Sequence, residues 1–90
     1  MDSNYENAMI ILKAMVERSR VNASSGDVIR RITNLECEEI NSAIPCLEEM
    51  NLVKTLGDIS KVNFDFFNVR LLPDGIEYYD KNFGKIKSID

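Results

Sequence analysis

The chain has 90 residues, the size of one small domain. Hydrophobic residues make up 44% and charged residues 29% of it, which is typical of a globular protein rather than a disordered tail or a membrane span. The longest apolar run, Ala8 to Leu12, is far shorter than the roughly 20 residues that cross a bilayer. The acidic Asp2 and Glu6 do not suit a signal peptide. We therefore expect one soluble, cytoplasmic domain over residues 1–90, without membrane association.

Catalytic chemistry is limited by the residue types that the chain lacks. It contains no His and no Trp, so the commonest general base and the commonest metal ligand are missing. If Cys37 and Cys46 lie on one helix, they are about 13 Å apart along its axis, too far for a disulfide. No glycine-rich phosphate loop and no nucleophile-elbow motif occurs. We expect two reduced thiols, no metal, no cofactor and no enzymatic activity.

The first periodic stretch runs from Asn4 to Arg20 and predicts a helix. Ser3 and Glu6 have the spacing of a capping box at its start. The next segment, Ser24 to Asp27, is expected to be a loop that leads into a short second helix. The apolar stripes of the two helices consist of Ala8, Ile11, Leu12 and Met15, and of Val28, Ile29 and Ile32.

A third helix is expected from about Leu35 to Met50. Either Thr33 or Asn34 can serve as its N-cap. Pro45 lies inside this helix and has no N–H to donate, so the helix should bend or begin late. Asn51 suits the left-handed position that ends a helix.

After Asn51 the apolar period changes from that of a helix to that of a strand. Leu52 to Leu56 predicts a first strand, and Gly57 with Asp58 predicts a turn. A second, half-buried strand follows, with Phe67, Val69 and Leu71 on its inward face. Pro73 opens a last helix that Gly84 ends, and residues 84–90 form a polar tail.

Two passages in this order of elements resemble the winged helix-turn-helix family. Residues 40–53, INSAIPCLEEMNLV, look like the family's recognition helix and its exit into the first wing strand. Residues 69–78, VRLLPDGIEY, look like the second wing strand running into the last helix. The resemblance implies an α+β winged helix: a three-helix bundle, a β-hairpin wing and a C-terminal helix. It also implies a short third strand near Val21 and a transcription-regulator function.

The expected core brings together the apolar faces of three helices under the hairpin. Its members are Tyr5, Ile11, Leu12, Met15, Val28, Ile32, Ile40, Ile44, Leu47, Phe67, Val69, Leu71 and Ile76.

In family members that bind DNA, the third helix enters the major groove. Regulators of this family often have Arg or Lys where this chain has Ser42, Pro45 and Cys46. From Thr33 to Asn51 the chain carries five carboxylates and no basic residue. Because a carboxylate row opposes phosphate binding, base readout by this helix should be weak.

We nevertheless expect duplex DNA to be bound mainly through phosphates, with Arg30, Arg31, Lys54, Lys61 and Arg70 as contacts. Asn41 can pair with adenine, and Ser42 is the other base-facing candidate. For each basic residue taken alone, an ordinary solvent-exposed side chain is the favoured explanation, and Asn41 is equally well explained as a neutral exposed helix residue. The alternative function is therefore a protein-interaction module, with its acidic third helix facing a basic protein partner.

A homodimer is also expected. Phe66 should point away from the inward face of its strand, and Phe64, Tyr78, Phe83 and Ile86 need not enter a core this small. Either the two phenylalanines form a second small cluster with Ile59 and Val62, or they are an exposed contact. Winged-helix regulators commonly pair through their terminal helices, here residues 4–20 and 74–83.

Overall fold

The computed structural model describes residues 3–18, 23–57, 64, 66 and 68–83. This part of the chain is a small α+β domain with four helices and a three-stranded antiparallel sheet. In chain order the elements are α1 (Ser3–Arg18), β1 (Ala23–Ser25), α2 (Gly26–Thr33), α3 (Cys37–Glu49), β2 (Val53–Leu56), β3 (Asn68–Leu71) and α4 (Pro73–Asn82).

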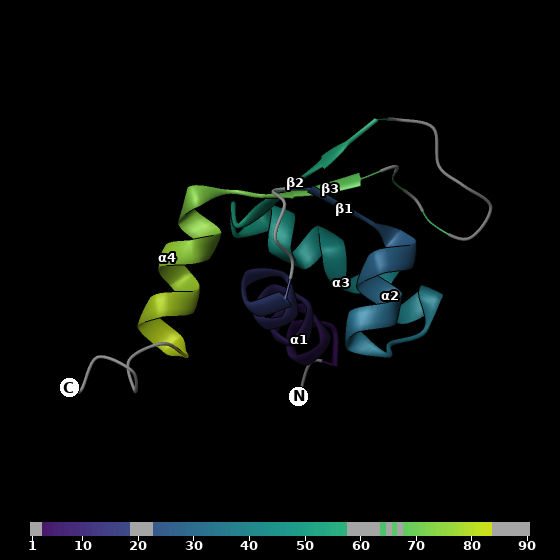
Figure 1. Cartoon of the computed structure of the whole chain (residues 1–90), viewed down its shortest axis with the longest axis horizontal. Helices are drawn as coiled ribbons and strands as arrows, with labels where there is room; N and C mark the ends of the chain where they lie inside the picture. Colours follow the sequence, from purple (N-terminus) through teal and green to yellow (C-terminus); the bar gives the residue numbers. More distant parts are fainter. Residues whose placement is uncertain (1–2, 19–22, 58–63, 65, 67, 84–90) are drawn as a thin grey trace.

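The sheet has the order β1-β3-β2, so β3 is its central strand. Val69 lies opposite Ser24 of β1 and opposite Thr55 of β2. The sheet covers α3 and α1, while α2 and α4 lie on either side of α1 (Figure 1). None of the described helices combines the length and the apolar character that a membrane crossing needs.

Helix α2 begins and ends where its capping groups allow. The Ser25 side chain accepts a hydrogen bond from the N–H of Val28 at 3.3 Å, which makes Ser25 the N-cap. At the other end, Asn34 has a left-handed conformation with φ of 64°, and its N–H donates to the Arg30 carbonyl at 2.8 Å. The prediction of a loop before this helix is wrong in part, because Ser24 and Ser25 belong to strand β1 and pair with β3.

The start of α3 differs from the prediction. Asn34 ends α2 instead of opening α3, and the N-cap of α3 is Glu36. The N–H of Glu36 donates to Oε1 of Glu39 at 2.8 Å, half of a capping box that begins with Glu instead of the usual Ser or Thr. This box starts α3 at Cys37, two residues later than expected.

The end of α3 agrees with the prediction. Asn51 adopts a left-handed conformation with φ of 64°, and its N–H donates to the Glu48 carbonyl at 2.9 Å. The helix continues through Pro45 as far as Glu49. The capping box explains the late start of α3, so that start is no evidence of an effect of Pro45. The bend expected at Pro45 stays a prediction.

A single apolar cluster fills the space between the helices and the sheet. Phe64 and Phe66 belong to it, each only 3% exposed, with ring centroids 5.7 Å apart. Of the two alternatives for these phenylalanines, the exposed contact is therefore wrong, and Ile59 and Val62 of the other alternative lie outside the described residues. The expectation that Phe66 points away from the core extended the alternation of β3 backwards, but β3 begins at Asn68, after both Phe64 and Phe66.

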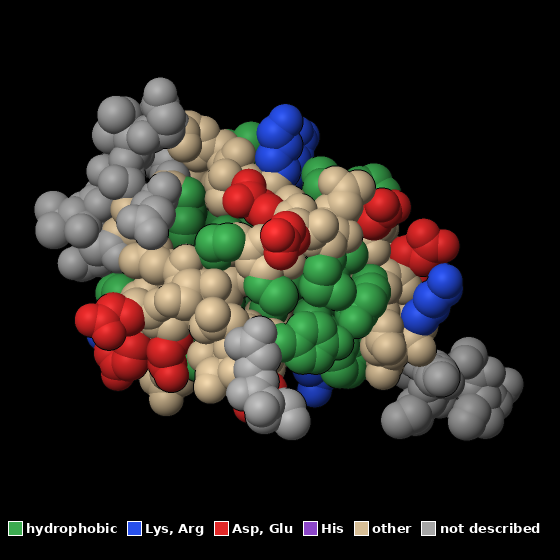
Figure 2. All heavy atoms as spheres, turned by 180° about the vertical axis from the view of Figure 1, so that it is seen from behind, with side chains coloured by type: hydrophobic (Ala, Val, Ile, Leu, Met, Phe, Trp, Pro, Cys, Tyr) green, Lys and Arg blue, Asp and Glu red, His purple; other side chains and the backbone are tan. Residues whose placement is uncertain are grey.

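Two other core predictions are wrong. Tyr5 is 42% exposed and Ile76 is 45% exposed. On α4 the buried residues are Gly75 and Tyr79, so the buried face includes Gly75 and the neighbouring Ile76 turns outward. Figure 2 shows an apolar patch on the surface between α1 and α4.

The remaining expected core residues divide into three sets. Those confirmed as buried are Ile11, Leu12, Met15, Ile40, Ile44, Leu47 and Val69. Half-buried are Val28, Ile32 and Leu71. Phe67 lies outside the described residues, as do Val21, Ile59, Val62, Ile86 and the tail 84–90.

Candidate nucleic-acid interface

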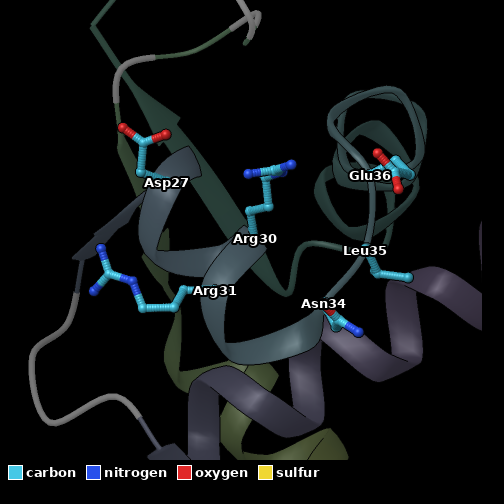
Figure 3. Close-up of a pocket in the computed structure, with 6 residues that line it drawn as sticks. All are labelled: Asp27, Arg30, Arg31, Asn34, Leu35 and Glu36. Carbon is cyan, nitrogen blue, oxygen red and sulfur yellow. The ribbon is translucent and has the colours of Figure 1, made fainter.

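The two arginines of α2 lie in its last turn and are both exposed. They line a surface hollow of about 440 Å³ together with Asp27, Asn34, Leu35 and Glu36. Arg30 and Arg31 point in different directions from the helix (Figure 3). The pair therefore offers two separated cationic groups rather than one bidentate clamp.

Carboxylates offset the charge of this hollow. Asp27 lies in the first turn of α2, where the helix dipole favours an anion, and Glu36 is the N-cap of α3. Two carboxylates thus accompany the two guanidinium groups of Arg30 and Arg31. The electrostatic attraction of this hollow for a phosphate is weaker than two arginines alone would give.

The exposed face of the sheet carries a second pair of cations. Lys54 on β2 lies directly opposite Arg70 on β3, and both side chains are exposed. Like charges at directly opposite positions are unfavourable, because their Cβ atoms lie only about 5 Å apart. An anion between the two side chains, such as a phosphate, would relieve this repulsion.

The outward face of α3 is uncharged or acidic. Asn41 is half-buried and Ser42 is exposed. Ser42 lines a hollow of about 590 Å³, and none of the lining residues is basic. The others are Asn4, Pro45, Cys46, Glu48 and Glu49.

Two of the α3 carboxylates hold the fold together. Glu39 accepts the N–H of Glu36 in the capping box. Glu48 accepts hydrogen bonds from the N–H and the hydroxyl of Thr55, at 3.1 and 2.8 Å, and so anchors the edge strand β2 to α3. These two carboxylates of α3 therefore have a structural role that is independent of any partner.

The predicted phosphate contacts form two groups. Lys54 and Arg70 are partners in the sheet, and Arg30 and Arg31 are neighbours on α2. The strand β1 links the groups, because it pairs with β3 beside Arg70 and runs directly into α2. Lys61 lies outside the described residues.

Sequence reasoning missed the acidic residues beside the arginines. Asp27 precedes Arg30 by three residues and Arg31 by four, a helical spacing that was available as a signal. Glu36 reaches the hollow only because the left-handed turn at Asn34 redirects the chain, which local patterning does not indicate.

Neither Cys37 nor Cys46 is in a disulfide, and both are half-buried. Among the described residues, no group of three or more Cys, Asp or Glu side chains is placed to hold a metal ion.

No protein-family model, no curated protein and no solved structure matches this chain.

Proposed function

We propose that this chain is a cytoplasmic winged helix-turn-helix protein of transcription-regulator type that binds duplex DNA mainly through phosphate contacts. The order of its elements supports the proposal, since helix, strand, two helices, hairpin and helix follow one another. The hairpin strands β2 and β3 are antiparallel, as the two strands of a wing are, and β1 adds a third strand at the other edge of β3.

The observation that carries the binding proposal is the pairing of Lys54 with Arg70. Two exposed cations opposite one another cost stability unless an anion offsets them, and the phosphate backbone is an extended anion. Arg30 and Arg31 add two further cations on α2. About three to five phosphate contacts per subunit would make log K fall against log salt with a slope of about −3 to −5.

Base readout contributes little in this proposal. The exposed face of α3 offers no arginine for guanine, and its carboxylates repel the duplex. Binding should therefore be weak at physiological salt and nearly independent of DNA sequence.

The test is fluorescence anisotropy with a labelled random-sequence duplex over a range of salt concentrations. Replacing both Lys54 and Arg70 by Ala should reduce the salt slope by about 2. The double Ala variant of Asn41 and Ser42 should leave the slope unchanged. Lys81→Ala is the matched control, because it removes a cation from α4, away from the proposed contacts.

Two results would contradict the proposal. Tight, salt-resistant binding of one sequence that depends on Asn41 or Ser42 would restore major-groove readout by α3. If Lys54→Ala and Arg70→Ala left the salt dependence of log K unchanged, the sheet would not be part of the DNA interface.

The acidic α3 favours a second candidate function, a protein-interaction module with a basic partner. Glu38 and Glu49 are exposed, and the hollow beside Ser42 has no basic lining residue. Absence of duplex binding at low salt would favour this candidate. Reversing the charges of Glu38 and Glu49 should then abolish capture of a basic peptide.

A further inference from the structure

A largely apolar groove of about 430 Å³ lies between α1 and α4 and belongs to the apolar patch of Figure 2. Its lining includes three aromatic side chains and two aliphatic ones, Tyr5, Tyr78, Phe83, Met9 and Ile10. Concave, mainly apolar sites of about 300 to 1,000 Å³ are typical of small-molecule binding. The groove has the size and the character of such a site.

Contacts between the two helices and within α4 hold the aromatic rings in place. The hydroxyl groups of Tyr5 on α1 and Tyr78 on α4 are 2.9 Å apart, so the two side chains meet between the helices. The Phe83 ring packs against the ring of the buried Tyr79, with centroids 5.6 Å apart. The groove is therefore formed before a ligand arrives, which lowers the entropic cost of binding.

The polar groups of the groove favour a cation. Glu6 carries the formal charge of the lining, because no Lys or Arg of the described part of the chain lines it. No other described residue forms an ion pair or a side-chain hydrogen bond with the Glu6 carboxylate. The side-chain nitrogen of Asn82 donates to the Tyr78 carbonyl at 2.8 Å, which leaves the side-chain oxygen of Asn82 as an acceptor.

The aromatic rings add to this preference. The face of a Tyr or Phe ring attracts an organic ammonium ion that lies within about 6 Å of the ring centroid. Neither Tyr5 nor Tyr78 has a ring contact with another described aromatic residue, so no such residue covers their faces. A carboxylate beside aromatic rings attracts a cation more strongly than either group does alone.

We propose that the groove between α1 and α4 binds a small organic ammonium ion that carries an apolar substituent. The ammonium group lies beside Glu6 and the ring of Tyr5, which are neighbours near the start of α1. Met9 lies one turn further along the same side of α1 as Tyr5, so the apolar substituent extends along Met9 toward Phe83.

This site is separate from the proposed DNA contacts. Lys54 and Arg70 lie on the sheet, Arg30 and Arg31 lie on α2, and none of them lines the groove. Cation binding is measured without DNA, so its failure would leave the DNA proposal standing. Failure of DNA binding would likewise leave the cation site standing.

Titration of the full chain, followed by two-dimensional NMR, tests the proposal with three ligands of similar size. Phenethylammonium is the cation, phenethyl alcohol is its neutral counterpart, and phenylacetate is the anion. The cation should bind with a Kd of about 1 mM, and the shifted resonances should belong to α1 and α4. The alcohol should bind about tenfold more weakly, and the anion should show no saturable binding.

Variants of the lining separate the carboxylate from the ring. Glu6→Gln should raise the Kd of the cation about fivefold and leave that of the alcohol unchanged. Tyr5→Leu should also raise the Kd of the cation about fivefold, whereas Tyr5→Phe keeps the ring and should stay within about twofold. Glu77→Gln is the matched control for Glu6→Gln, because Glu77 is exposed on α4 but does not line the groove.

Several results would overturn the proposal. Equal affinities for the cation and the alcohol would show that the groove has no preference for charge. Equal effects of Glu6→Gln and Glu77→Gln, or no saturable binding of the cation, would remove the site. If the resonances of the groove moved with protein concentration and not with the cation, a second copy of the chain would occupy the groove instead.

Discussion

Gly75 offers a substitution whose expected effect is opposite to that of helix propensity. It lies in the first turn of α4, where an Ala would ordinarily favour the helix by up to about 1 kcal/mol. A Cβ at this position would overlap the carbonyl oxygen of Leu52 and lie 2.9 Å from Cδ1 of Leu71. The Leu52 carbonyl cannot simply move aside, because it accepts the N–H of Leu72 at 3.0 Å.

The magnitude follows from these contacts. Overpacking against a fixed backbone costs about 1 to 3 kcal/mol, and weakening the hydrogen bond between Leu72 and Leu52 costs about 1 kcal/mol more. The gain in helix propensity offsets about 1 kcal/mol of this loss. Gly75→Ala should therefore lower the free energy of unfolding by about 1 to 3 kcal/mol. For a domain of this size, each kcal/mol corresponds to a decrease in Tm of about 4 to 8 °C.

Urea unfolding followed by circular dichroism measures the effect. Glu77→Ala is the matched control, because Glu77 is exposed on the same helix and its replacement should change stability by less than about 0.5 kcal/mol. If Gly75→Ala proved as stable as the unmodified chain, or more stable, the close approach of α4 to Leu52 would be refuted.

Two further predictions concern side-chain hydrogen bonds. The bond from the Tyr79 hydroxyl to Glu17 raises the pKa of Tyr79 above its ordinary value of 10.0, so the fold favours the neutral phenol. The contribution of this bond to stability should be complete below pH 10 and lost as the pH rises through the higher folded-state pKa. In urea unfolding at increasing alkaline pH, Tyr79→Phe should therefore lose less stability than the unmodified chain. Glu48→Ala removes Oε2, the one oxygen that accepts both hydrogen bonds from Thr55, and should cost about 1 kcal/mol in urea unfolding, whereas Glu48→Gln keeps an amide oxygen as acceptor and should retain most of this stability. Equal losses for the two Glu48 variants would show that these hydrogen bonds contribute nothing.

Local patterns predicted most of the fold. The change of apolar period after Asn51 separated the helices from the hairpin, because helices and strands place side chains at different angular intervals. The left-handed stop at Asn51 and the opening of α4 at Pro73 were also predicted, since both depend on the conformational limits of single residues. The basic residues of the candidate interface were also named from the sequence, as expected phosphate contacts.

Tertiary structure decided which of these residues lie near one another. The sheet register places Lys54 opposite Arg70, although 16 positions separate them in the chain and no local pattern joins them. Likewise, Glu36 lines the same hollow as Arg30 and Arg31 only because the left-handed turn at Asn34 redirects the chain.

Burial at the margins was also a tertiary outcome. A surface contact was one of two alternatives for Phe64 and Phe66, and both are buried, while Tyr5 was expected inside and is exposed. Amphipathic spacing defines the centre of an apolar face well, because the neighbours there are fixed by the helix itself. At the edge of the face, burial depends on which other element packs alongside, and that is settled only when α1, α4 and the sheet come together.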